Sequence, residues 1–423
     1  MKNYKNILPI LLFIIFLTGS IIYIYFPTMQ YGFMTGWDDQ WQVLNSQTEG
    51  GITMSNLKQI FTSVVMHQYS PLNQCLYSAI YQIDGYNPMY YHAICMIIHL
   101  MNSYLVFIFI YILTKDHLHL STINLQSLAF IVALFFGIHP MQVESVAWIS
   151  ASKILTSSFF YLLATISYIQ FLKEGKKRLW GGTIILFISA LLCKEQAVIF
   201  PVWQSLLWVI YKQKTFFRKD FFIQILPFLT ISLIWGIIYL TYISGYHKDA
   251  FETQYVWSQR IIFTVYSFTE YIVKWIIPYK LLYLYPYPMS QHESSPLWLL
   301  YYPTAIVLII WCFNSWFQKK IVLLTFAFVI IHLILVLHII PLTRYAIIAD
   351  RYIYLPSIGI TFLISYYFIN SNNKLSLPKK VLGWGFTIAL YAILVFLSSK
   401  RIEVWSSTQI LKQEIKELYN QNR

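Results

Sequence analysis

The chain has 423 residues, of which 58% are hydrophobic, 19% aromatic and only 11% charged, and its mean hydropathy is +0.57. Soluble domains carry about 25% charged residues, so this composition excludes a soluble globular protein and indicates a polytopic membrane protein. The formal net charge of +13 is typical of nucleic-acid-binding proteins, but the placement of the basic residues described below assigns it to membrane topology instead.

Apolar runs suited to membrane spans recur along the whole chain, and a span needs about 20 mostly apolar residues. The first run closes with Tyr23, Tyr25 and Phe26 instead of the small residues of a cleavage site, so we expect a retained span and not a signal peptide. The predicted fold is all-α, with about eleven transmembrane helices and extracytoplasmic loop helices. The spans lie near residues 6–26, 92–113, 125–139, 144–172, 179–193, 196–211, 221–244, 297–314, 321–340, 347–369 and 380–398.

Some segments depart from this simple pattern. The span at 144–172 is too long, and too polar at its start, for a simple helix. Two outer connections are long, at about 27–91 and 246–296, and the amphipathic segment 259–280 is typical of a helix in the membrane interface. We predict one transmembrane domain over residues 1–398, followed by a short amphipathic tail over 399–423.

Basic residues mark one side of the predicted membrane topology. The short turns that share this side with the N-terminus are KEGKKR (173–178), KQKTFFRK (212–219), QKK (318–320) and KLSLPKK (374–380). Together with Lys2, Lys5 and Lys115, these turns hold more than half of the 30 basic residues but only three of the 17 acidic ones. This positive-inside pattern makes that side cytoplasmic, and it leaves the long connections, the tail and most carboxylates on the extracytoplasmic side.

Charged residues gather at the extracytoplasmic ends of five separate segments. Asp38 and Asp39 follow the first span directly, and charges in or beside a span are costly and mark functional sites. The other polar residues on this side are His139, Glu144, Lys153, Lys194, Glu195, Arg344, Asp350 and Arg351. Taken singly, Glu144, Asp350 and Arg351 could instead pair with one another, and His139, which precedes Pro140, could cap a helix end.

This set suits a reaction between a lipid-borne phosphate and a water-borne hydroxyl group. A leaving lipid phosphate needs Lys or Arg to stabilise its charge, and the attacking hydroxyl needs a carboxylate to take its proton. Two alternatives stay open: a transporter or flippase of a lipid-linked sugar, and an O-antigen-ligase-like polymerase. A transporter would be expected to place its charged residues near the membrane midplane, in two related halves of the chain. An O-antigen-ligase-like polymerase would be expected to have a large outer loop in the second half of the chain.

Six sequence blocks resemble, in order, those of the transmembrane-and-tetratricopeptide-repeat mannosyltransferases. This family belongs to the GT-C superfamily, together with the protein O-mannosyltransferases and the aminoarabinose transferases. The resemblance covers nearly all of the chain. The blocks are WDDQWQVLN (37–45), YYHAICMIIHLMNSYLVF (90–107), FGIHPMQVESVAWIS (136–150), LCKEQAVIFP (192–201), ADRYIYLPSIGI (349–360) and KRIEVWSS (400–407).

The resemblance implies an inverting glycosyltransferase of the EC 2.4 type. A mannose-like monosaccharide would pass from a polyprenyl-phosphate carrier to a hydroxyl of a protein Ser/Thr, an envelope glycan or a lipid. Asp38 would be the general base, with Asp39 as its neighbour or substitute. His139 and Glu144 would line the cavity. The residues expected to bind the lipid phosphate or order the site are Lys153, Lys194, Glu195, Arg344, Asp350, Arg351 and Tyr352.

Two departures from the family pattern affect these expectations. Family members often carry Arg-Lys-Asp after AWIS, whereas this chain has Ser152, Lys153 and Ile154, so only the Lys is retained. The family also carries helical repeats after the last span, whereas residues 399–423 show one amphipathic segment and no 34-residue period. The resemblance therefore indicates the sugar-lipid donor more directly than a protein acceptor.

Cofactor, partners and location follow from the same considerations. We expect no tightly bound organic cofactor, and the four isolated cysteines support neither a zinc site nor a disulfide framework. The sequence leaves open whether the site binds Mg²⁺ or Mn²⁺; Asp38, Asp39 and Glu144 could supply oxygen ligands for either ion. Expected partners are the polyprenyl-phosphate-linked sugar, a protein or glycan/lipid acceptor and membrane lipids. The Ile-, Lys- and Asn-leaning composition suits undecaprenyl phosphate and a bacterial inner membrane, with the site facing the periplasm.

Overall fold

The computed structural model describes residues 4–66, 68–212, 218–239, 255–289, 302, 320–339, 346–372 and 374–421, and its regular elements are all helices. The helices of at least 13 residues are α1 (Tyr4–Tyr25), α5 (Pro71–Asp84), α6 (Pro88–His117), α7 (Thr122–Ile138), α9 (Ser152–Glu174), α10 (Lys177–Cys193), α11 (Phe200–Lys212), α12 (Lys219–Ile238), α13 (Trp257–Ile276), α16 (Lys320–Leu333), α17 (Pro356–Asn372), α18 (Leu377–Val404) and α19 (Thr408–Gln421). The shorter ones are η1 (Phe26–Gln30), α2 (Asp39–Gln42), α3 (Ser46–Glu49), α4 (Met54–Thr62), η2 (Pro140–Gln142), α8 (Val143–Ala147), η3 (Ile149–Ala151), η4 (Glu195–Ile199) and η9 (Asp350–Ile353).

Membrane spans are evident from helix length and composition. Within the described residues, five helical segments are long and apolar enough to cross a membrane: Pro9–Gln30, Pro88–His117, Ile149–Glu174, Lys219–Ile238 and Leu377–Val404. A sixth is the bent pair Thr122–Ile138 and Pro140–Ala147, if it is counted as one span. The all-α polytopic membrane fold is therefore confirmed. The number eleven stays a prediction, and the predicted span at 297–314 lies outside the described residues.

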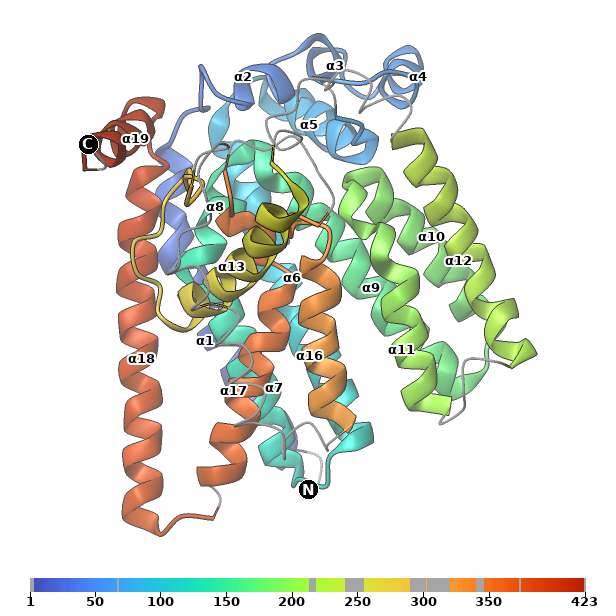
Figure 1. Cartoon of the computed structure of the whole chain (residues 1–423), viewed down its shortest axis with the longest axis vertical. Helices are drawn as coiled ribbons and strands as arrows, with labels where there is room; N and C mark the ends of the chain where they lie inside the picture. Colours follow the sequence, from blue (N-terminus) through green and yellow to red (C-terminus); the bar gives the residue numbers. More distant parts are fainter. Residues whose placement is uncertain are drawn as a thin grey trace.

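The helices form a bundle with two distinct ends. Figure 1 shows α2 to α5 and α19 together at one end, which we call the outer end, whereas the N-terminus, the last turn of α17 and the first turn of α18 lie at the other, the inner end. Polar contacts at the inner end connect α6, α9 and α11 to one another. Asp116 of α6 pairs with Lys173 of α9 at 2.9 Å, and the Lys212 ammonium of α11 donates to the Leu172 carbonyl at 2.6 Å.

The predicted span at 144–172 is divided in the structure. Pro140 has no N–H to donate and its ring opposes helix continuation, so the chain turns by 56° between α7 and the segment Pro140–Ala147. Residues 143–151 then form two short helices before α9 begins at Ser152. The polar start of this predicted span thus forms a compact corner instead of part of one continuous helix.

Other predicted elements agree with the structure in outline. α13 covers most of the amphipathic segment 259–280, and α19 forms the amphipathic tail helix. α18 continues to Val404, past the predicted domain boundary at residue 398. Close packing of α1, α6 and α7 requires the glycine at 137, because a Cβ there would stand 2.9 Å from Ile21 and 3.0 Å from Ser103. These packed helices support the corner that carries the site.

Candidate active site

Asp39 joins the first outer connection to the corner before α9. One carboxylate oxygen accepts the backbone N–H of Met34 at 2.9 Å. The other accepts both the backbone N–H of Ser150 at 2.9 Å and its hydroxyl at 2.5 Å. The side chain is fully buried, and burial raises the pKa of Asp39 to about 6. With its oxygens occupied, Asp39 is placed to hold the loop in position.

Asp38 differs from its neighbour. Its side chain is half-buried, and no hydrogen bond or ion pair reaches its carboxylate from the described part of the chain. Lys153 and Tyr283 both interact with it electrostatically. An available carboxylate beside a cation is what a general base requires, so the structure separates the roles of the two adjacent aspartates.

Lys153 lies buried between the first outer connection and the cationic residues of the site. Its ammonium donates to the side-chain oxygens of Gln42, at 2.6 Å, and Gln68. Lys194, Glu195 and Arg351 also interact with Lys153 electrostatically. Lys153 therefore connects the environment of Asp38 to that of the two other cations.

Glu144 and Arg351 form a buried ion pair across 207 positions of sequence. The backbone N–H of Arg351 donates to one carboxylate oxygen of Glu144 at 2.9 Å, and its guanidinium donates to the other. The guanidinium also lies over the rings of Trp148 and Tyr352, at 5.3 and 4.8 Å from their centroids. Glu144 thereby orients Arg351, which remains a quarter exposed.

A small pocket that is open to solvent lies next to this ion pair. Lys194, Arg351 and Tyr352 line it together, and they come from blocks more than 150 residues apart. Glu195 pairs with Lys194 at 3.2 Å, at the start of η4. The remaining walls are mostly apolar or hydroxyl-bearing: Ile154, Ser157, Ser158, Tyr161, Gln196, Ala197, Ile199, His332, Tyr354, Leu355 and Pro356.

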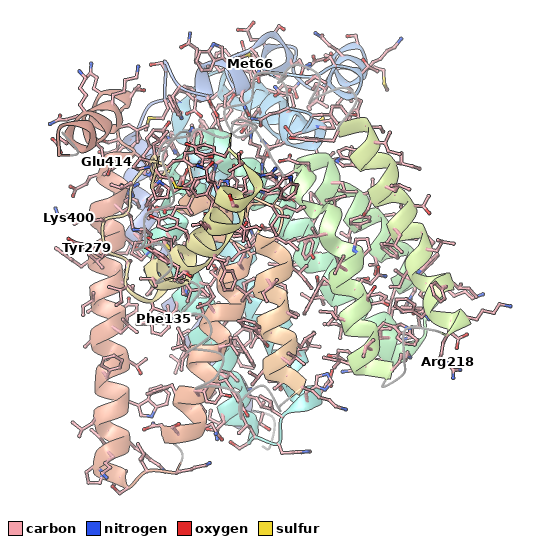
Figure 2. All side chains as sticks on the ribbon, in the orientation of Figure 1. Met66, Phe135, Arg218, Tyr279, Lys400 and Glu414 are labelled. Carbon is pink, nitrogen blue, oxygen red and sulfur yellow. The ribbon has the colours of Figure 1, made fainter. Side chains whose placement is uncertain are left out.

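Asp350 belongs to a second buried network. One carboxylate oxygen accepts the Tyr285 hydroxyl at 2.7 Å, and Arg401 is its main electrostatic counter-charge. Arg401 in turn donates to Glu414 of α19 at 2.6 Å, and the other oxygen of Glu414 accepts the Tyr283 backbone N–H at 3.1 Å. Glu414 lies where α19 approaches the end of α18 (Figure 2). This network ties the tail helix to the loop after α13.

One predicted site residue, His139, is not part of this arrangement. His139 caps η2: its Nδ1 accepts the Met141 N–H at 3.2 Å, its Nε2 bonds the Trp275 carbonyl at 2.8 Å, and its ring stacks on Trp275. With both nitrogens engaged by backbone groups, His139 takes the helix-capping role that the sequence left open. Arg344 lies outside the described residues.

The structure also shows functional neighbours that the sequence did not indicate. Ser150, Gln42 and Gln68 contact site residues, but they are uncharged and carry no compositional signal. Arg401 lies in the block KRIEVWSS, and the sequence indicated this position only through the family resemblance. A buried Arg in the last turn of an apolar helix is the signal that could have found it.

Two of the three oxygen ligands considered for a metal ion are already engaged in contacts within the protein. Asp39 accepts three hydrogen bonds and Glu144 holds Arg351 through both oxygens, which leaves Asp38 as the available carboxylate of the three. No group of three or more His, Cys, Asp or Glu side chains placed to hold a metal occurs in the part of the chain that the structure describes.

Comparison with known proteins agrees with the six blocks. No family model matches the chain. Protein O-mannosyl-transferase Tmtc1 of Drosophila melanogaster is 27% identical over 186 residues, which are 41% of this chain and 20% of that protein. Protein O-mannosyl-transferases TMTC3 and TMTC1 of Homo sapiens are 31% and 26% identical over 133 and 147 residues, 31% and 33% of this chain.

These alignments span only 13% and 16% of the two human proteins, so each relative is far longer than the matched region. They do confirm the resemblance that the blocks indicated, and the apolar helices confirm an integral membrane protein. The chain is a polytopic membrane protein similar in sequence to the protein O-mannosyl-transferases of the TMTC type.

Proposed function

We propose that this protein is an inverting glycosyltransferase that moves a mannose-like sugar from a polyprenyl-phosphate carrier to a hydroxyl group. The observation that carries the proposal is that Lys153 interacts electrostatically both with Asp38, whose carboxylate has no partner among the described residues, and with Lys194 and Arg351, which line a pocket. The relatives' names, which include O-mannosyl transfer, support the same reaction class.

The reaction assigns one task to each group. The acceptor oxygen attacks the anomeric carbon of the sugar while its proton passes to the Asp38 carboxylate. The bond between that carbon and the phosphate oxygen breaks with its electron pair on the phosphate, which leaves as the polyprenyl phosphate. Attack opposite the leaving group inverts the anomeric centre. Lys194 and Arg351 would stabilise the phosphate charge that develops in the transition state.

The pocket suits the end of a lipid-linked phosphate. A phosphate is best bound by Arg through two parallel donors and by Lys as a point charge, and both line the pocket here. The apolar residues of the same pocket, such as Ile154 and Leu355, suit the first carbons of a prenyl chain. We propose that the outer end of the bundle faces the extracytoplasmic side, which in a bacterial cell is the periplasm.

Replacement of the proposed base tests this function. In membranes or nanodiscs supplied with polyprenyl-phosphate mannose and a hydroxyl acceptor, Asp38→Asn should lower the single-turnover rate about 10²- to 10⁴-fold. Its matched control is Asp84→Asn, the same chemical change at an exposed outer position. Lys194→Gln should instead weaken donor binding. Transfer at the wild-type rate by Asp38→Asn, at equal protein levels, would remove the assignment.

A further inference from the structure

Four aromatic side chains from four separate segments form one continuous group at the outer end. Trp37 meets Tyr283 edge-on at 5.0 Å between ring centroids, and Tyr283 meets Trp405 in the same manner at 5.6 Å. Trp405 stacks on Trp148 at 5.6 Å with 19° between the ring planes. We call these residues, Trp37, Trp148, Tyr283 and Trp405, the aromatic cluster.

The polar atoms of the aromatic cluster are not satisfied. The indole N–H groups of Trp37, Trp148 and Trp405 and the hydroxyl of Tyr283 are buried, and none has a hydrogen-bond partner among the described residues. Buried donors of this kind are nearly always paired in native proteins, and an unpaired one is costly. Four of them in one contact group indicate a place where polar atoms from outside the chain are bound.

The position of the aromatic cluster narrows what that ligand is. Trp37 directly precedes Asp38, and the Arg351 guanidinium lies 5.3 Å from the Trp148 ring centroid. Tyr283 interacts electrostatically with Arg351, Glu144 and Asp38. Trp37 is the half-buried member of the cluster, whereas the side chains of the other three members are buried. The cluster therefore lies between the proposed phosphate ligand and the proposed base.

We propose that the aromatic cluster binds the sugar ring of the donor, an inference that rests on the proposed function. A pyranose ring offers C–H faces that pack on aromatic rings, and hydroxyl groups that accept hydrogen bonds from indole N–H and phenol O–H donors. In a glycosyl transfer the group between the leaving phosphate and the base is the sugar itself. An apolar lining with a few directed polar groups is the usual composition of a ligand site.

Removal of single polar atoms separates binding from packing. Tyr283→Phe deletes only the unpaired hydroxyl, and Trp37→Phe deletes the buried indole N–H of the half-buried member. The matched controls are Tyr25→Phe and Trp208→Phe, which delete the same buried, unpaired groups elsewhere in the described chain. For each variant, binding of polyprenyl-phosphate mannose and of polyprenyl phosphate without sugar is measured as the thermal stabilisation that each lipid gives. The KM values of the donor and of the acceptor are measured in the transfer reaction.

We expect Tyr283→Phe and Trp37→Phe to weaken binding of the sugar-bearing lipid about five- to tenfold. Binding of the bare lipid phosphate, and the thermal stability of the ligand-free protein, should stay at wild-type values. The two controls should bind both lipids as the wild type does. A merely structural role would leave both lipids bound equally well in every variant, and this result would overturn the inference while leaving the proposed function intact.

Two further outcomes are decisive. A rise in acceptor KM with unchanged donor binding would place the acceptor, and not the donor sugar, on the aromatic cluster, and so would overturn the donor assignment. A wild-type protein that binds neither lipid and transfers no sugar would remove the proposed function, and the inference with it.

Discussion

The carboxylate of Asp39 accepts both the backbone N–H and the hydroxyl of Ser150, although the two residues are 111 positions apart. The bond fixes the first outer connection against the corner that precedes α9. Because Asp38 is the next residue along this fixed backbone, its position relative to Lys153 and the pocket depends on that attachment. Asp39 is therefore a positioning residue, and Asp38 is left with the available carboxylate.

Replacement of Asp39 should destabilise the protein. Asp39→Ala leaves the N–H groups of Met34 and Ser150 without their acceptor in a buried site, and we expect a loss of about 2–4 kcal/mol. Asp38→Ala should change stability by less than about 0.5 kcal/mol, because its carboxylate makes no hydrogen bond to the described residues. Thermal unfolding in detergent compares the two. Equal destabilisation would contradict the separation of their roles.

The raised pKa of Asp39 predicts two pH dependences of opposite sign. Between about pH 4 and 6 the folded protein retains a proton on this carboxyl that the unfolded chain has released, so this group's contribution to stability falls as pH rises through that window. Activity should change the other way. A protonated carboxyl accepts fewer hydrogen bonds, so transfer should fall as pH is lowered through about 6.

Ser150→Ala tests whether Asp39 causes the fall in transfer rate at low pH, which we call the acid limb of the pH profile. The Ser150 hydroxyl lowers the pKa of Asp39 by bonding to its charged form. Its removal should move the midpoint of the acid limb to higher pH, which a rate profile from pH 4 to 9 measures. A midpoint that does not move would assign the limb to another group.

The Glu144–Arg351 pair should behave as a coupled unit. Glu144→Ala leaves the guanidinium without its counter-charge, and we expect a loss of about 3–5 kcal/mol. The double variant Glu144→Ala/Arg351→Ala should cost clearly less than the sum of the two single variants, because neither charge is then left unpaired. Unfolding of the four proteins in a double-mutant cycle measures the coupling. Additive losses would show that the pair does not act as one unit.

The tail helix should contribute to the order of the outer end. Glu414→Gln weakens the pairing of the buried Arg401 guanidinium and should cost about 1–3 kcal/mol. The control is Glu403→Gln, since Glu403 pairs with Lys400 in an exposed ion pair of small expected value. A loss for Glu414→Gln no larger than that for Glu403→Gln would mean that α19 is not anchored through this contact.

The sequence predicted the features that arise from local pattern. Apolar runs indicated α1, α6, α12 and α18 as spans, since length and composition alone decide whether a helix can cross a bilayer. The charges at one end of the spans indicated where a site would lie, and the six blocks indicated the relatives. The corner at residues 140–151 was only partly predictable, because its three short helices depend on packing more than on periodicity.

Only the tertiary structure distinguished residues of the same type. Asp38 and Asp39 are adjacent and chemically identical, and long-range hydrogen bonds from Ser150 give them different environments. His139 and Lys194 both looked like site residues, yet one caps a helix and the other lines the pocket. Nothing in the sequence groups the tryptophans, whereas contacts across the whole chain bring Trp37, Trp148 and Trp405 together through Tyr283. A side chain's role follows from its partners, and those partners are set by folding.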